Sequence, residues 1–126
     1  MNKITAVLKN IKSVDNINLL EFEKSGNIIK VLILQMNINI KKGDKALLYI
    51  KPTKLFLNSQ ECEYENRLKV RIKEIQRGEI LANVVCGFEN HKIEVLMLKE
   101  NINFAKNAYS YLYFKSSDVS VEVLND

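Results

Sequence analysis

The sequence contains little cysteine, proline, glycine or histidine, and it contains no tryptophan. Its two cysteines, Cys62 and Cys86, form no CxxC motif and no cluster with histidine, so neither a disulfide framework nor a zinc site is expected. One proline and four glycines in 126 residues are too few for a disordered or fibrous chain. We therefore expect a folded protein of a reducing compartment, the cytoplasm.

Further absences concern membranes and catalysis. Residues 1–12 alternate polar and apolar side chains and offer no signal peptide, and no later run approaches the length of a membrane span. The sequence shows no glycine-rich phosphate loop and no nucleophile paired with a base, and its single histidine, His91, lies in a predicted surface turn. We expect a protein that is not an enzyme, with no membrane insertion, redox cofactor or metal centre.

The sequence does contain an internal repeat. A shift of 64 positions aligns Asn2 with Asn66, and it aligns residues 29–34 with residues 93–98. The same shift aligns residues 48–51 with residues 112–115, so the register holds along the chain. Only two copies occur, which favours a duplicated domain over a solenoid. We predict a first domain at 1–57, a linker at 58–65 and a second domain at 66–126.

Each copy has the periodicity of β-strands. Residues 4, 6 and 8 are apolar and alternate with polar residues, whereas residues 28–34 and 93–98 are almost continuously apolar. The continuous runs predict strands at the centre of each sheet, buried on both faces. Gly26, Gly43 and Asn107 lie in predicted turns between strands. An all-β fold of two tandem small barrels, each with four or five short strands, accommodates this pattern.

At this level of detail each copy resembles the TOBE or Mop domain, a molybdenum-pterin-binding module. The family pattern opens with Asn and spaced apolar residues, matched from Asn2 and from Asn66. It closes with Lys-Ala-Ser/Thr-x-Val, matched by Lys51-Pro52-Thr53-Lys54-Leu55 and Lys115-Ser116-Ser117-Asp118-Val119. The resemblance implies OB-like five-stranded barrels in tandem. It also implies homo-oligomers, dimers or trimers of the two-domain chain, that bind molybdate or tungstate between domains.

The chemistry of the matched residues suits such a ligand. A tetrahedral dianion needs hydrogen-bond donors and positive charge, which Lys, Ser, Thr and free backbone N–H groups supply. The candidate oxyanion-binding residues are Asn2, Lys30, Lys51, Thr53, Asn66, Lys115, Ser116 and Ser117. From spacing alone, solvated turns remain an alternative interpretation of the same residues.

The two copies depart from the family pattern in different ways. Where binding members have Ser-Ala-Arg before the Asn, this chain has Glu63-Tyr64-Glu65, which places two carboxylates near the expected anion. In the middle strand the family tends to have Thr, and the aligned positions hold Lys30 and Glu94. We therefore expect unequal sites.

Two other functions remain open at this stage. The protein could be a degenerate domain that serves as an interaction or regulatory module beside a molybdate transporter. Tyr109, Tyr111 and Tyr113 alternate on one predicted strand face, which suits an oligomer interface or a platform for single-stranded nucleic acid. The interface is favoured over nucleic acid because Lys and Arg do not visibly interleave with these tyrosines.

Overall fold

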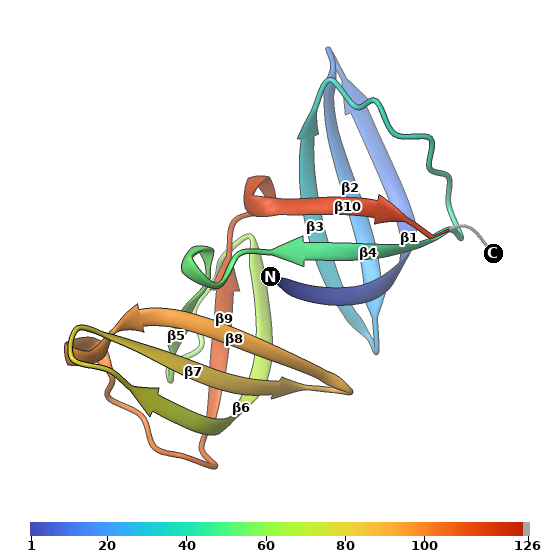
Figure 1. The fold of residues 1–126 in the computed structure, drawn as a ribbon. Helices are drawn as coiled ribbons and strands as arrows, with labels where there is room; N and C mark the ends of the chain where they lie inside the picture. Colours follow the sequence, from blue (N-terminus) through green and yellow to red (C-terminus); the bar gives the residue numbers. More distant parts are fainter. Residues whose placement is uncertain (125–126) are drawn as a thin grey trace.

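Two curled antiparallel sheets, each of five strands, make up most of the computed structural model, which describes residues 1–124 (Figure 1). One sheet has the strand order β10-β4-β1-β2-β3 and the other the order β5-β9-β6-β7-β8. The strands in the first half of the sequence are β1 (Asn2–Val14), β2 (Ile17–Lys24), β3 (Asn27–Leu34), β4 (Lys45–Ile50) and β5 (Phe56–Asn58). Those of the second half are β6 (Asn66–Arg77), β7 (Leu81–Phe88), β8 (His91–Leu98), β9 (Tyr109–Phe114) and β10 (Val119–Val123). The predicted all-β class with OB-like five-stranded units is confirmed.

The first strand of each repeat is long rather than short, because it pairs with two partners in succession. The front part of β1 pairs with β4 and its rear part pairs with β2, and β6 pairs in the same way with β9 and β7. The register with the second partner shifts between Leu8 and Asn10 in β1, and between Ile72 and Glu74 in β6. Such β-bulges bend a strand and increase its twist, which curls the sheet.

The loop before β4 and the equivalent loop before β9 contact the bulge of their own repeat by the same backbone hydrogen bonds. The backbone N–H of Gly43 donates to Leu8 and that of Asn107 donates to Ile72, at 2.9 and 2.7 Å. Both loop residues have a positive φ, 94° for Gly43 and 72° for Asn107, a conformation that Gly and Asn adopt most readily. The predicted turns at these two positions are therefore confirmed.

The prediction that residues 28–34 and 93–98 occupy the sheet centres is wrong. Both β3 and β8 lie at a sheet edge, and each buries one face only. Ile29 and Val31 are fully buried, whereas Ile28 is 46% exposed and Leu34 is 66% exposed. The outward faces hold both apolar and charged residues, Ile28 and Leu34 beside Lys30 in β3, so the apolar run extends beyond the buried face.

Each sheet takes its fifth strand from the other half of the sequence. After β4, the chain passes through a 3₁₀ turn, η1 (Pro52–Lys54), and β5 then pairs with β9 of the second sheet. After β9, the chain passes through η3 (Ser116–Asp118), and β10 then pairs with β4 of the first sheet. In Figure 1 the red β10 lies beside the green β4 in the upper sheet. The division into 1–57 and 66–126 thus describes the sequence repeat, whereas the two sheets exchange strands.

The exchange joins the two halves into one packed unit. Buried side chains from both halves form a single connected cluster, which includes Leu8 and Phe22 from one half and Ile72 and Phe114 from the other. The exchanged strands also contact the far edge of each sheet, β10 against β3 and β5 against β8, so each curl is nearly closed. No helix among residues 1–124 has the length and apolar character needed to cross a membrane.

Candidate functional site

One buried asparagine in each half of the molecule forms hydrogen bonds with the edge strand of the other half. The side chain of Asn2 donates from Nδ2 to the carbonyl of Glu94 and accepts at Oδ1 from its N–H, both at 2.8 Å. Asn66 makes the same pair with Lys30 at 2.8 and 2.7 Å. Both side chains are at most 4% exposed. The polar atoms of Asn2 and Asn66, two of the predicted site residues, are therefore engaged with backbone rather than directed at solvent.

These hydrogen bonds bring the strand-end turns next to the aligned middle-strand residues. Turn η3 lies against β3, which carries Lys30, and turn η1 lies against β8, which carries Glu94. Each predicted site thus combines residues from both repeats. Lys30, bonded to Asn66, lies on the strand that contacts η3 and therefore the turn of Ser116. Glu94, bonded to Asn2, lies on the strand that contacts η1 and therefore the turn of Thr53.

A pocket of about 200 Å³ opens between the two turns. Its walls include Lys51 and Lys54 from the η1 region and Ser117 and Asp118 from η3. The remaining lining residues are Met1, Tyr49 and Ser120. Two of the predicted residues, Lys51 and Ser117, are therefore brought together from opposite halves. One water needs about 10–15 Å³ of such volume, so a small tetrahedral anion fits with several waters.

The electrostatics of this pocket favour an anion. Lys51 and Lys54 supply two ammonium groups against the single carboxylate of Asp118, and Ser117 and Ser120 supply hydroxyl groups. The Tyr49 hydroxyl donates a hydrogen bond to Glu122, and this bond raises the pKa of Tyr49. Lys54 was not among the predicted residues, although it lies within the quoted Lys51-to-Leu55 motif; the aligned residue of the second repeat is Asp118.

At the start of η3, the donors of Ser116 are used within the protein, by the carboxylate of the exposed Glu65. Oε1 of Glu65 accepts hydrogen bonds from the backbone N–H of Ser116 at 2.9 Å and from its hydroxyl at 2.6 Å. These two bonds, aided by the positive charges of Lys115 and Lys30, lower the pKa of Glu65. Ser116 is 6% exposed, so its donors are already used within the protein.

Tyr113, which the repeat aligns with Tyr49, is fully buried instead of lying on an exposed face with Tyr109 and Tyr111. Phe56 of the exchanged β5 stacks on its ring at 5.2 Å between centroids, and Tyr64 meets it edge-on at 5.9 Å. Its hydroxyl donates to the carbonyl of Gln60 and accepts from the N–H of Cys62. The sequence does not distinguish the three tyrosines, because nothing in it indicates that β5 covers Tyr113.

Cations do interleave with the exposed Tyr109 and the half-buried Tyr111, contrary to the expectation from the sequence. Arg67, Lys69 and Arg71 project from β6 onto the same face. The guanidinium of Arg67 lies 5.9 Å from the Tyr111 ring centroid, and Lys69 and Arg71 lie 5.0 and 5.8 Å from that of Tyr109. The interleaving arises between neighbouring strands, so it is invisible in a reading along β9 alone.

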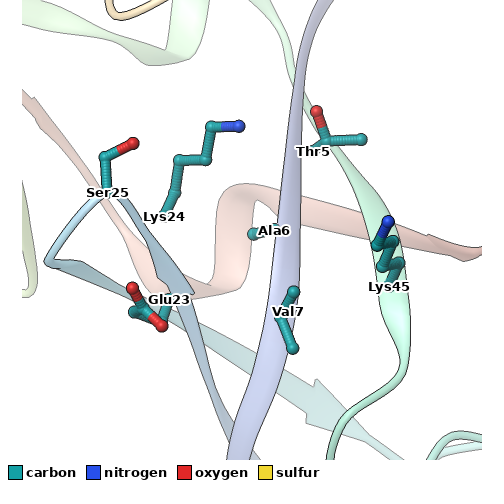
Figure 2. Close-up of a pocket in the computed structure, with 7 residues that line it drawn as sticks. All are labelled: Thr5, Ala6, Val7, Glu23, Lys24, Ser25 and Lys45. Carbon is teal, nitrogen blue, oxygen red and sulfur yellow. The ribbon is translucent and has the colours of Figure 1, made fainter.

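A second hollow, of about 390 Å³, lies on the first sheet and contains none of the predicted residues. Figure 2 shows Thr5 and Val7 of β1 between Lys45 of β4 and the Lys24–Ser25 end of the β2 hairpin. Glu23 also lines this hollow, and its carboxylate pairs with Lys9 at 3.4 Å. None of the sequence-predicted residues reaches this hollow, so we do not assign the oxyanion to it.

The two cysteines lie in a buried strand and in an exposed segment, whereas His91 lies in a strand rather than in the predicted surface turn. Cys86 is buried in β7, where burial raises the pKa of its thiol to about 12, and Cys62 is exposed. His91 begins β8 directly after the turn, and it is partly buried, which together with the nearby charge of Lys24 lowers its pKa. No group of three His, Cys, Asp or Glu side chains within residues 1–124 is arranged to hold a metal ion.

Comparison with solved structures matches this chain to a crystal structure of the cytoplasmic molybdate-binding protein ModG with molybdate bound. The TM-score is 0.89 at 16% sequence identity, and the match covers 98% of this chain and 96% of that chain. No protein-family model and no curated protein sequence matches the chain. At this identity the likeness establishes the fold, along the whole length of both chains.

Proposed function

We propose that this protein binds a tetrahedral oxyanion of the molybdate and tungstate class in the pocket between η1 and η3. The observation that carries the proposal is the convergence of Lys51 and Ser117 on one pocket. These residues come from opposite repeats and were both chosen from the sequence for their oxyanion chemistry. Lys54 adds a second ammonium group. The likeness to ModG, a molybdate-binding protein of the same fold, supports the same ligand class.

In physiological terms, we propose a cytoplasmic protein that stores, buffers or senses the oxyanion, with no catalytic step. Homo-oligomers of the two-sheet unit, and association with a molybdate transporter or its regulator, belong to the same proposal. The alternative of a degenerate module without strong anion binding is supported by Glu65, whose carboxylate is bonded to Ser116 of η3, and by the acidic Glu94 on β8, the strand that lies against η1.

Calorimetric titration with molybdate and tungstate, with sulfate for comparison, tests the proposal. A hydrogen bond to a charged group contributes about 1.5–3 kcal/mol, so Lys51→Ala should weaken binding about 10- to 100-fold. Lys106→Ala, which removes an exposed lysine outside the pocket, should leave the affinity unchanged. Absence of heat from the unmodified protein at millimolar molybdate would overturn the proposal in favour of the degenerate module.

A second candidate function is binding of single-stranded nucleic acid, which rests on the cationic strip of Arg67, Lys69, Arg71, Tyr109 and Tyr111. Aromatic rings and cations that alternate on a sheet face offer both base stacking and phosphate contacts. Tyr109 is 62% exposed, and only Arg67 has an acidic partner, Glu61 at 3.2 Å. We rank this candidate second, because the strip is short and the net charge of the chain is only +4.

A further inference from the structure

The carboxylate of Glu65 has the hydrogen-bonding pattern expected of an oxygen in a bound oxyanion. One oxygen, Oε1, accepts from both the backbone N–H and the hydroxyl of Ser116, at 2.9 and 2.6 Å. An N–H at the start of a turn and an adjacent hydroxyl are the donors that an anion site at a strand end presents. Glu65 therefore satisfies donors that a free ligand would otherwise use.

The surroundings of this carboxylate are cationic. Lys30 on β3 and Lys115 at the start of η3 both act on Glu65 through their positive charge. Lys30 belongs to one repeat and Lys115 to the other, as Lys51 and Ser117 do in the open pocket. A donor pair thus bonds one oxygen of a carboxylate that belongs to the protein itself, and the charges of two lysines act on that carboxylate.

The first repeat lacks this arrangement. The shift of 64 positions aligns Glu65 with Met1 and Ser116 with Pro52. Proline has neither an N–H nor a hydroxyl, so η1 offers no such donor pair, and methionine offers no carboxylate to fill one. Met1 instead lines the open pocket beside Lys51. The duplication has therefore produced one open region and one region that contains its own anion.

The short chain connection to Asn66 makes the Glu65 carboxylate a strong competitor of any free oxyanion for the Ser116 donors. Glu65 directly precedes Asn66, whose side chain is locked to Lys30 by two hydrogen bonds, so the carboxylate is held close to Ser116. A group tethered by a short segment has an effective concentration of about a millimolar or more. A free oxyanion must displace the carboxylate at this effective concentration in order to reach the same donors.

We propose that Glu65 acts as a built-in anion that occupies a second oxyanion site, formed by Ser116, Lys30 and Lys115, and keeps free oxyanion out of it. The chain then binds free oxyanion only at the Lys51–Ser117 pocket. This inference rests on the proposed function for the class of ligand. It predicts that removal of one carboxylate uncovers a binding site that the natural sequence keeps closed.

The test compares Glu65→Ala with Glu63→Ala, which removes an exposed carboxylate two residues away and so matches the change in charge. Molybdate is titrated into each protein by calorimetry, and the backbone amide signals of Ser116 in η3 and Lys54 in η1 are followed by NMR. We expect Glu65→Ala to bind one additional molybdate, with a shift of the Ser116 amide. Binding at Ser116 should be at least about tenfold tighter than in the unmodified protein and in Glu63→Ala. Glu65→Gln, which keeps the hydrogen-bond acceptor but removes the charge, replaces Glu65→Ala if that variant does not fold.

The two amide signals separate this inference from the proposed function. Equal numbers of bound molybdate in Glu65→Ala and Glu63→Ala would overturn the built-in anion, as would a Ser116 shift in the unmodified protein at the same ligand concentration. A gain at Ser116 with no response at Lys54 in any protein would instead overturn the Lys51–Ser117 pocket and leave the built-in anion standing. A lack of response at both amides in every protein would overturn both.

Discussion

The side chain of Asn66 is joined to the backbone of Lys30 by two hydrogen bonds, at 2.7 and 2.8 Å, across the boundary between the two sheets. Asn2 repeats this relationship with Glu94. An asparagine side chain at the start of each repeat therefore donates one hydrogen bond to the edge strand of the other repeat and accepts one from it, as the backbone of a neighbouring strand would. This double link positions β3 and β8 beside the turns that form the candidate site.

Removal of this link should destabilise the whole molecule. Asn66→Ala would leave the part-buried N–H and carbonyl of Lys30 without these partners, at a cost of up to about 1–3 kcal/mol each. We expect the free energy of unfolding in urea to fall by at least about 1 kcal/mol. Asn103→Ala removes an exposed asparagine and should have little effect. Equal stability of the two variants would contradict a structural role for Asn66.

The strand exchange should transmit a change in the second repeat to the first sheet. Val119 of β10 is 5% exposed and lies opposite Ile50 of β4. Val119→Ala removes buried methyl groups and should lower stability by about 2 kcal/mol. Hydrogen exchange should accelerate in β4 more than in β9, although β9 is closer along the chain. Acceleration confined to β9 would contradict the exchanged pairing.

The ionisation of Glu65 should contribute to stability at neutral pH. Its pKa is lowered in the folded protein, mainly by the two bonds from Ser116, so the unfolded chain takes up a proton first as pH falls. The contribution of Glu65 is therefore present above the ordinary pKa of a glutamate and is lost as pH falls through the lowered value. Urea unfolding measured from pH 7 to pH 3 should show a weaker acid dependence in Glu65→Gln than in Glu63→Gln. Identical pH profiles would contradict the bonds to Ser116.

His91 should titrate below the ordinary range of a histidine. Burial is the larger cause and the positive charge of Lys24 adds to it, so the neutral imidazole is favoured and stability falls as pH drops through the ordinary histidine pKa. An NMR titration of the single histidine measures this pKa directly. Lys24→Gln should raise the pKa without restoring it fully, because burial remains. An unchanged pKa in that variant would rule out the contribution of Lys24.

Single-stranded nucleic acid offers a direct test of the cationic strip on β6 and β9. If the strip binds phosphates, affinity for an oligonucleotide should fall steeply with salt, and Arg71→Gln should weaken binding and reduce the salt slope. Lys12→Gln removes an exposed lysine of β1 outside the strip and serves as the control. A gel-shift series without binding at low salt would exclude this function.

Local patterns were sufficient to predict the strands, the turns and the duplication. The alternation through Ile4, Ala6 and Leu8 reflects a strand with one buried face, and Gly43 reflects a backbone conformation with positive φ. Both signals depend on near neighbours in the chain, so a sequence is enough to predict them. The repeat could be predicted for the same reason, because the two copies satisfy the same local constraints at a constant spacing.

Only the tertiary structure decided which half supplies the fifth strand of each sheet, and this exchange determines the candidate site. The sequence of β10 fits an edge strand equally well beside β4 or in its own half, since hydrogen bonding along a ladder depends little on side-chain identity. Once the strands exchange, Lys51 meets Ser117 in one pocket, whereas Glu65 meets Ser116 and uses its donors. The sequence alone determined the residue types that suit an oxyanion. Their grouping into one open pocket and one self-occupied site required contacts between residues more than fifty positions apart, such as Glu65 and Ser116 at a separation of 51.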